Sequence, residues 1–310
     1  MRTHPLGVIC VGMTTEKTFQ TATEFSLVTH ADPRCVVACC ISTGLIRGIL
    51  RGEVQSEKDV DALIDTAFAW VDAWQKRGRK DEDEDPTEDD WVDASVKIGK
   101  AEEISTDEQK QSEEQQNPGP ALDRAELQRH TNAKDFEELE LDDAMKMGYV
   151  YKSLGAAILA LRRAIRDSRL LHTSSDKVSF SRNMFENLIT SIVMEGGDAD
   201  TNACIAGALL GSWLGYTALP PHWSDGIDNR DWLLQKCEAL SQTIGITNNL
   251  PDYRGGQDPD ARKDGGKGLL SKEALEAREM AFMEMYLRKG VERNGTEKQK
   301  RGWKGKLFSK

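Results

Sequence analysis

A short polar run between two apolar segments has the composition of a metal-binding turn. Residues 196–202 read Gly-Gly-Asp-Ala-Asp-Thr-Asn. Asp198, Asp200 and Thr201 offer carboxylate and hydroxyl oxygens, which are the ligands that Mg²⁺, Mn²⁺ and Ca²⁺ prefer. The two glycines permit a tight turn that would direct these oxygens the same way. The run predicts either a site for a hard divalent cation or an ordinary helix N-cap, because Asp and Thr both cap helices.

The spacing of these residues excludes an EF-hand calcium loop. Such a loop requires glycine at its sixth position and glutamate at its twelfth. Counted from Asp198, those positions hold Ala203 and Leu209. A calcium-sensor function is therefore not expected for this turn.

The segment after the turn has an unusual glycine spacing. Gly207, Gly211 and Gly215 recur every four residues within a strongly apolar run. Each glycine costs a helix about 1 kcal/mol relative to alanine, and close approach of a second helix is the usual compensation. We therefore expect a buried helix from about 198 to 217 that holds the aspartate turn near the centre of the molecule.

Apolar residues at helical spacing predict further helices on both sides of this segment. Thr14 or Thr15 can cap one helix, Asp32 is a good N-cap for the next, and Pro33 suits the first position of that second helix. Alternation typical of strands is weak, and the best candidate is the run from Val8 to Val11. The predicted fold class is all-α, a compact multi-helix domain. The expected helices cover about 15–29, 33–50, 56–77, 149–167, 181–195, 231–243 and 271–289.

Composition divides the chain into four parts. Residues 1–78 and 145–247 are apolar enough to form the first and second parts of one helical domain. Residues 79–144 are dense in charged side chains, so they bury too little surface to offset the entropy of ordering. We interpret them as an acidic, largely disordered insertion, either a surface loop or a segment that binds a protein partner. Residues 248–310 are expected to form a polar linker, an amphipathic helix and a basic tail.

Charge and cysteine content indicate the class of protein. The net charge of −11 disfavours non-specific binding to nucleic acid, because phosphates repel an acidic surface. The six cysteines include no CxxC pair, which predicts reduced thiols. The first residues do not form a signal peptide, and the most apolar run, 203–219, is shorter than the roughly 20 residues of a bilayer span. We expect an intracellular protein, cytoplasmic or nuclear, with no membrane or nucleic-acid partner.

Three segments together resemble the ADP-ribosylglycohydrolase family. The specific one is Gly-Gly-Asp-Ala-Asp-Thr-Asn-Ala-Cys-Ile-Ala-Gly-Ala-Leu-Leu-Gly-Ser-Trp-Leu-Gly at 196–215, followed by Leu-Pro-Pro-His-Trp at 219–223. The start of the chain, with Met-Arg and then Thr-His-Ala-Asp-Pro at 29–33, is similar to central segments of the family in the right order. Met-Gly-Tyr-Val at 147–150 is a weaker match. The resemblance covers about 1–75 and 145–245, and it implies a helical hydrolase.

The resemblance implies roles for the residues that match family motifs. Asp198, Asp200 and Thr201 correspond to the C-terminal half of a site for two Mg²⁺ ions. His30 corresponds to a histidine that lines the ADP-ribose pocket, although a histidine at a helix end bonded to the backbone is an alternative. The remaining substrate-binding candidates are Gly196, Gly197 and Tyr149. Tyr149 would stack on adenine or ribose, or would simply pack within its helix.

The sequence departs from the family pattern at its beginning. The family's N-terminal third, with a Thr-Asp-Asp metal motif and an acidic residue used in catalysis, has no counterpart in these 310 residues. We therefore expect a domain incomplete at its N-terminus, a catalytic residue outside this sequence, and weak or partial Mg²⁺ binding.

Two functions are compatible with these motifs. The first is Mg²⁺-dependent hydrolysis of the glycosidic bond that links ADP-ribose to a protein side chain or a small acceptor. The alternative is a non-catalytic ADP-ribose-binding or scaffold protein. Both imply an ADP-ribosylated protein or an ADP-ribose-containing small molecule as the partner, and the sequence does not specify which linkage is cut.

Overall fold

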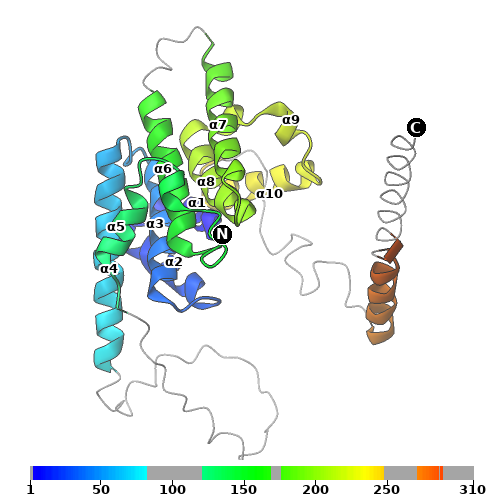
Figure 1. The fold of residues 1–310 in the computed structure, drawn as a ribbon, viewed down its shortest axis with the longest axis horizontal. Helices are drawn as coiled ribbons and strands as arrows, with labels where there is room; N and C mark the ends of the chain where they lie inside the picture. The colour runs from blue at the N-terminus through cyan, green and yellow to red at the C-terminus, as the bar shows by residue number, and fades with distance from the viewer. Residues whose placement is uncertain (1–2, 82–120, 169–175, 248–270, 286, 289–310) are drawn as a thin grey trace, which may run out of the picture. The chain divides into compact units, whose positions relative to one another are not determined.

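The computed structural model describes residues 3–81, 121–168, 176–247, 271–285 and 287–288, and it divides into two units (Figure 1). The first unit covers residues 1–247 and contains α1 to α10. The second covers residues 248–310, in which residues 272–285 are helical. No strand occurs among the described residues, so the all-α prediction is confirmed.

Two long apolar helices form the centre of the first unit. They are α3, Pro33–Leu50, and α6, Val150–Asp167, and most of their side chains are buried. The backbone N–H of Arg34 donates to the side chain of Asp32, and Pro33 occupies the first helical position, as predicted. The helix α6 contacts α3 and also α8, Ala199–Leu214. These three helices therefore fix the relative positions of residues 32–35, 149–153 and 198–202.

Helices on either side of α3 complete the first half of the domain. The helix α2, Thr15–Leu27, begins where Thr14 accepts a hydrogen bond from the backbone N–H of Lys17. Before it lie α1, His4–Ile9, and the 3-10 turn η1, Cys10–Gly12, so the candidate strand around Val8 is helical instead. A Cβ atom on Gly7 would lie 2.6 Å from the side chain of Ile46. Only glycine at position 7 therefore lets α1 approach α3 this closely.

The insertion that we predicted to be largely disordered, residues 79–144, is folded at both of its ends. The helix α4 runs over Glu57–Asp81, and residues 121–144 contain α5, Arg124–Thr131, and the 3-10 turn η3, Glu137–Leu139. Residues 82–120 lie outside the described part of the chain. The charged composition of 121–144 concealed a few apolar side chains that are 4% exposed or less and join the core: Leu127, Phe136, Leu139 and Leu141.

The second half of the domain follows α6. The helix α7, Lys177–Met194, begins four residues before the predicted start because Asp176 accepts a hydrogen bond from the N–H of Ser179. After α8, Gly215 adopts a φ of 82°, which ends the helix three residues before the predicted position. The remaining elements are the turn η5, Tyr216–Ala218, and the helices α9, Pro221–Ser224, and α10, Arg230–Thr243.

The expectation that the glycines of α8 allow close helix packing is wrong. A Cβ atom on Gly207 would meet only Ile189, at 3.9 Å, and one on Gly211 would meet nothing within 4 Å. Gly215 ends the helix through its positive φ rather than through packing. The burial of α8 comes from its opposite face, through Ile205, Ala206, Leu209 and Leu210.

The helix α3 alone among the described helices is long and apolar enough to span a bilayer by length and composition, and 72% of that stretch is buried within the protein. The run 203–219 does not meet the same criterion. This burial is that of a core helix in a folded domain.

Candidate active site

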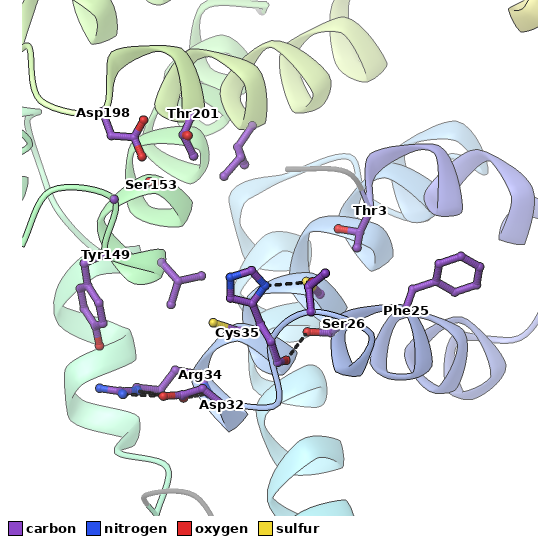
Figure 2. A pocket seen from close by; sticks show the side chains of 16 residues that line it. Thr3, Phe25, Ser26, Asp32, Arg34, Cys35, Tyr149, Ser153, Asp198 and Thr201 are labelled. Atoms are coloured by element: carbon purple, nitrogen blue, oxygen red, sulfur yellow. Dashed lines mark hydrogen bonds and ion pairs between the residues drawn. The ribbon is translucent and has the colours of Figure 1, made fainter. Parts of the chain in front are cut away.

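A cavity of about 670 Å³ opens where α2, α3, α6 and α8 meet. It is lined by the end of α2, the start of α3, the start of α6 and the start of α8 (Figure 2). Four of the predicted site residues line it: His30, Tyr149, Asp198 and Thr201. Asp200, Gly196 and Gly197 do not line it. The structure therefore brings together residues from three segments that are far apart in the sequence.

The carboxylate of Asp198 faces the cavity without serving as a helix cap. Asp198 occupies the N-cap position of α8, yet its side chain accepts no capping hydrogen bond. Within the described residues no cation pairs with it. A Cβ atom on Gly148 would lie 2.9 Å from its Oδ2, so glycine at 148 makes room for the carboxylate. Asp198 thus presents its oxygens to the cavity, beside Thr201 (Figure 2).

A buried hydrogen bond fixes the start of α8 against α6. The hydroxyl of Ser153 donates to Oδ1 of Asn202 at 2.6 Å, and each residue is 2% exposed. Because Thr201 precedes Asn202 directly, this bond also fixes the direction in which Thr201 points. Ser153 was not predicted as a site residue, since a serine within an apolar helix has no motif of its own.

The turn before Asp198 depends on its two glycines. Gly196 and Gly197 have φ values of 78° and 65°, in the left-handed region that favours glycine. A Cβ atom on Gly197 would lie 1.9 Å from the carbonyl oxygen of Leu141. These glycines therefore position Asp198 through the backbone. Asp200 is exposed, on a part of the first turn of α8 that does not line the cavity.

Asp32 and Arg34 form an ion pair on the opposite side of the cavity from Asp198 (Figure 2). Arg34 donates to Asp32 through Nε and Nη2, and this bonding holds the pKa of Asp32 below its ordinary value. Asp32 was predicted only as a helix cap. In the structure its carboxylate also orients the guanidinium of Arg34, which borders the cavity.

Tyr149 borders the same end of the cavity and contacts this ion pair. The guanidinium of Arg34 lies 5.7 Å from the centre of the Tyr149 ring, within the range of a cation–π contact. The Tyr149 hydroxyl donates to Oε1 of Glu126 at 2.8 Å. Burial, followed by this hydrogen bond, raises the pKa of Tyr149 to about 12, so the phenol remains protonated at neutral pH. A neutral, anchored aromatic ring is suited to stacking against a ligand.

His30 is exposed, in the connection between α2 and α3, on the edge of the cavity. Its Nδ1 is 2.9 Å from the hydroxyl of Thr29. The alternative that its ring bonds to the backbone at a helix end is therefore not what the structure has. His30 presents its imidazole beside the cavity, where a ligand could reach it.

His130 lies behind Tyr149, and its lowered pKa should make the stability of the protein depend on pH. Its ring is 5.7 Å from that of Tyr149, its Nδ1 is bonded to the carbonyl of Glu126, and burial lowers its pKa below the ordinary value. As pH falls from about 6.5, the unfolded chain binds a proton before the folded chain does, so stability decreases. Urea unfolding between pH 7 and pH 5 should show this decrease, and His130→Gln should reduce it. An equal decrease in the variant would assign the effect to other groups.

The chemistry of the donors at one end of the cavity suits a hard cation. Asp198 supplies a carboxylate without a protein partner, and Thr201 adds a hydroxyl. Mg²⁺ prefers six oxygen ligands and commonly retains several waters. No cluster of three or more His, Cys, Asp or Glu side chains with metal-binding geometry exists among the described residues. A cation held here would therefore depend on water or a ligand for most of its coordination.

The chain is similar in sequence to a known protein family and to individual known proteins. The family model for ADP-ribosylglycohydrolase matches residues 1–249. A putative ADP-ribosyl glycohydrolase of Acanthamoeba polyphaga mimivirus is 51% identical over 45 residues, 14% of this chain and 13% of that protein. The ADP-ribosylhydrolase ARH3 of Gallus gallus is 32% identical over 118 residues, 37% of this chain and 29% of that protein.

The chain thus spans less than a third of the length of either relative. No solved structure matches it. The family match is nevertheless continuous across the cavity, from the start of the chain through α8 and α10. Because that match covers most of the chain and includes every residue that lines the cavity, the protein belongs to the ADP-ribosylglycohydrolase family.

Proposed function

We propose that this protein hydrolyses the glycosidic bond between ADP-ribose and a protein side chain or small acceptor, with Mg²⁺ as cofactor. The observation that carries the proposal is the cavity itself. Thr201 and Asp198, whose carboxylate makes no capping hydrogen bond, lie at one end of it. Tyr149 and the Asp32–Arg34 ion pair lie at the other end. Family membership supports the same reaction class.

The two ends of the cavity suit different parts of such a ligand. The anchored ring of Tyr149 offers a flat face for the base or a ribose, and Arg34 adds a positive charge whose position Asp32 fixes. Asp198 and Thr201 would hold the cation. When bound there, Mg²⁺ supplies positive charge that polarises the ribose hydroxyls. Asp198 and Thr201 would thereby position the ribose whose anomeric carbon carries the leaving group.

The described residues do not include a clear proton donor for the leaving group. Arg34 keeps Asp32 ionised, so Asp32 is suited to orienting its partner rather than to donating a proton. His30 is exposed at the cavity edge and could accept a hydrogen bond from a ligand hydroxyl. The residues of this cavity would therefore bind and orient the ligand.

A second function is favoured by the small number of metal ligands. The described residues provide no group of three side chains with metal-binding geometry, and Asp200 does not line the cavity. A protein with this cavity and only partial metal coordination would bind ADP-ribose without cleaving it. Such a protein would act as a reader or scaffold for ADP-ribosylated partners.

Calorimetric titration of ADP-ribose, with and without Mg²⁺, tests both functions. We expect Mg²⁺ to strengthen binding, because Asp198 and Thr201 would hold the cation and its positive charge would attract the oxygens of the ligand. Release of ADP-ribose from an ADP-ribosylated protein in the same buffer would identify the hydrolase, and Mg²⁺-dependent binding without release would identify the reader. Absence of binding under both conditions would contradict both functions.

We also propose an intracellular location and a protein partner. All six cysteines are free in the structure, and Cys204 and Cys237 are exposed, which suits a reducing compartment. The acidic segment proposed to bind a partner falls largely on residues 82–120, outside the described part of the chain.

A further inference from the structure

Two cysteines on one face of α3 line the proposed substrate cavity. Cys35 and Cys39 are both free, partly exposed, and part of the cavity wall, and Figure 2 shows Cys35 among the lining side chains. The neighbouring Cys40 is fully buried, within 3.6 Å of both the carbonyl of Phe19 and the hydroxyl of Thr23. The proposed function uses none of these thiols, so the lining pair requires its own explanation.

The helical spacing of the pair favours a bridging atom over a disulfide. Residues four apart on a helix are neighbours on one face, with Cβ atoms about 5–6 Å apart. A disulfide needs Cβ atoms about 3.5–4.5 Å apart. A central atom bonded to both sulfurs makes the connection between the two Cβ atoms one bond longer than a disulfide. The Cβ atoms can then keep the separation that the helix imposes. The pair is therefore suited to sharing one central atom without distortion of α3.

The surroundings of the pair favour a soft, neutral adduct. Burial, followed by the negative charge of Asp32, raises the pKa of Cys35, so its thiol is protonated at neutral pH. Soft sulfur ligands select soft, thiophilic centres, whereas the oxygens of Asp198 and Thr201 select hard cations. The cavity thus combines two sets of donors with opposite preferences.

We propose that Cys35 and Cys39 form a dithiol site that takes a single soft, thiophilic centre of the trivalent arsenical class. The reaction with phenylarsine oxide, C₆H₅As=O, forms two As–S bonds. The oxygen leaves as water with the two thiol protons, and arsenic keeps its oxidation state. The adduct would occupy the wall of the cavity and exclude ADP-ribose, a consequence that rests on the proposed function.

Intact-mass spectrometry of the full chain with one equivalent of phenylarsine oxide tests the site. We expect one arsenical per chain, at a mass increase equal to the reagent minus water. Cys35→Ser and Cys39→Ser should each remove this adduct at one equivalent, because a single thiol binds an arsenical far more weakly than a pair. The matched control, Cys204→Ser with Cys237→Ser, removes the exposed thiols and should retain the adduct.

Unfolding curves of each variant establish that loss of the adduct does not reflect loss of the fold. The proposal would be overturned if the wild-type protein failed to form the adduct. It would also be overturned if a folded Cys35→Ser/Cys39→Ser double variant still formed it. The adduct needs no ADP-ribose, so this result is independent of the proposed function. Competition is a separate measurement: saturating ADP-ribose should slow adduct formation at least tenfold if the ligand occupies the same cavity.

Discussion

Replacing Asp198 with alanine is expected to abolish the Mg²⁺-dependent part of ADP-ribose binding while leaving the free energy of unfolding nearly unchanged. The carboxylate faces the cavity, and it makes neither a capping hydrogen bond nor an ion pair within the described residues. Removal of groups that merely support a metal ligand typically costs about 10–100-fold in metal affinity. Loss of a ligand itself should cost at least about 100-fold, measured by calorimetry at fixed Mg²⁺.

Asp123 provides the matched control, because it is an aspartate that does cap a helix. It lies before α5 and accepts a hydrogen bond from the backbone N–H of Ala125 at 2.8 Å. Asp123→Ala should lower the free energy of unfolding by about 1 kcal/mol and leave ADP-ribose binding unchanged. The reverse pattern, in which Asp198→Ala loses stability and keeps Mg²⁺-dependent binding, would make Asp198 an ordinary cap.

The sequence predicted those parts of the fold that depend on local signals. Asp32 is a recognisable cap, and Thr14 or Thr15 could cap the helix before it; the structure uses Thr14, and both helices begin where expected. Apolar periodicity also predicted helices at 33–50 and 149–167, and in the structure these are the core helices α3 and α6. The family motif also placed Asp198 and Thr201 in one site with His30, and all three line the cavity.

The sequence could not predict features that depend on contacts between distant segments. Leu127 and Leu139 are scattered among charged residues, and only their packing against the rest of the domain shows that 121–144 is folded. The same limit applies to Arg34, whose place beside Tyr149 depends on how α3 meets α6. It also applies to Asp200, because a helical turn directs it away from the cavity although it is only two residues from Asp198.

Among the glycine substitutions, Gly197→Ala is expected to have the largest effect on stability. Its φ of 65° costs an L-residue roughly 1–2 kcal/mol. The added Cβ would lie 1.9 Å from the carbonyl oxygen of Leu141, so one of the two backbone segments must move. Overpacking of this kind typically costs about 1–3 kcal/mol. The expected total loss is about 3 kcal/mol, measured by urea unfolding, together with loss of ADP-ribose binding as Asp198 moves.

Gly211→Ala, within the same 196–215 motif, is the matched substitution. Its effect on the free energy of unfolding should have the opposite sign. Gly211 lies within α8, and an added Cβ would meet nothing within 4 Å. Alanine there should stabilise the helix by up to about 1 kcal/mol without changing ligand binding. If both variants instead had similar stability, the turn before Asp198 would not be held against residue 141. The position of the Asp198 carboxylate would then depend on its own side-chain contacts rather than on the backbone.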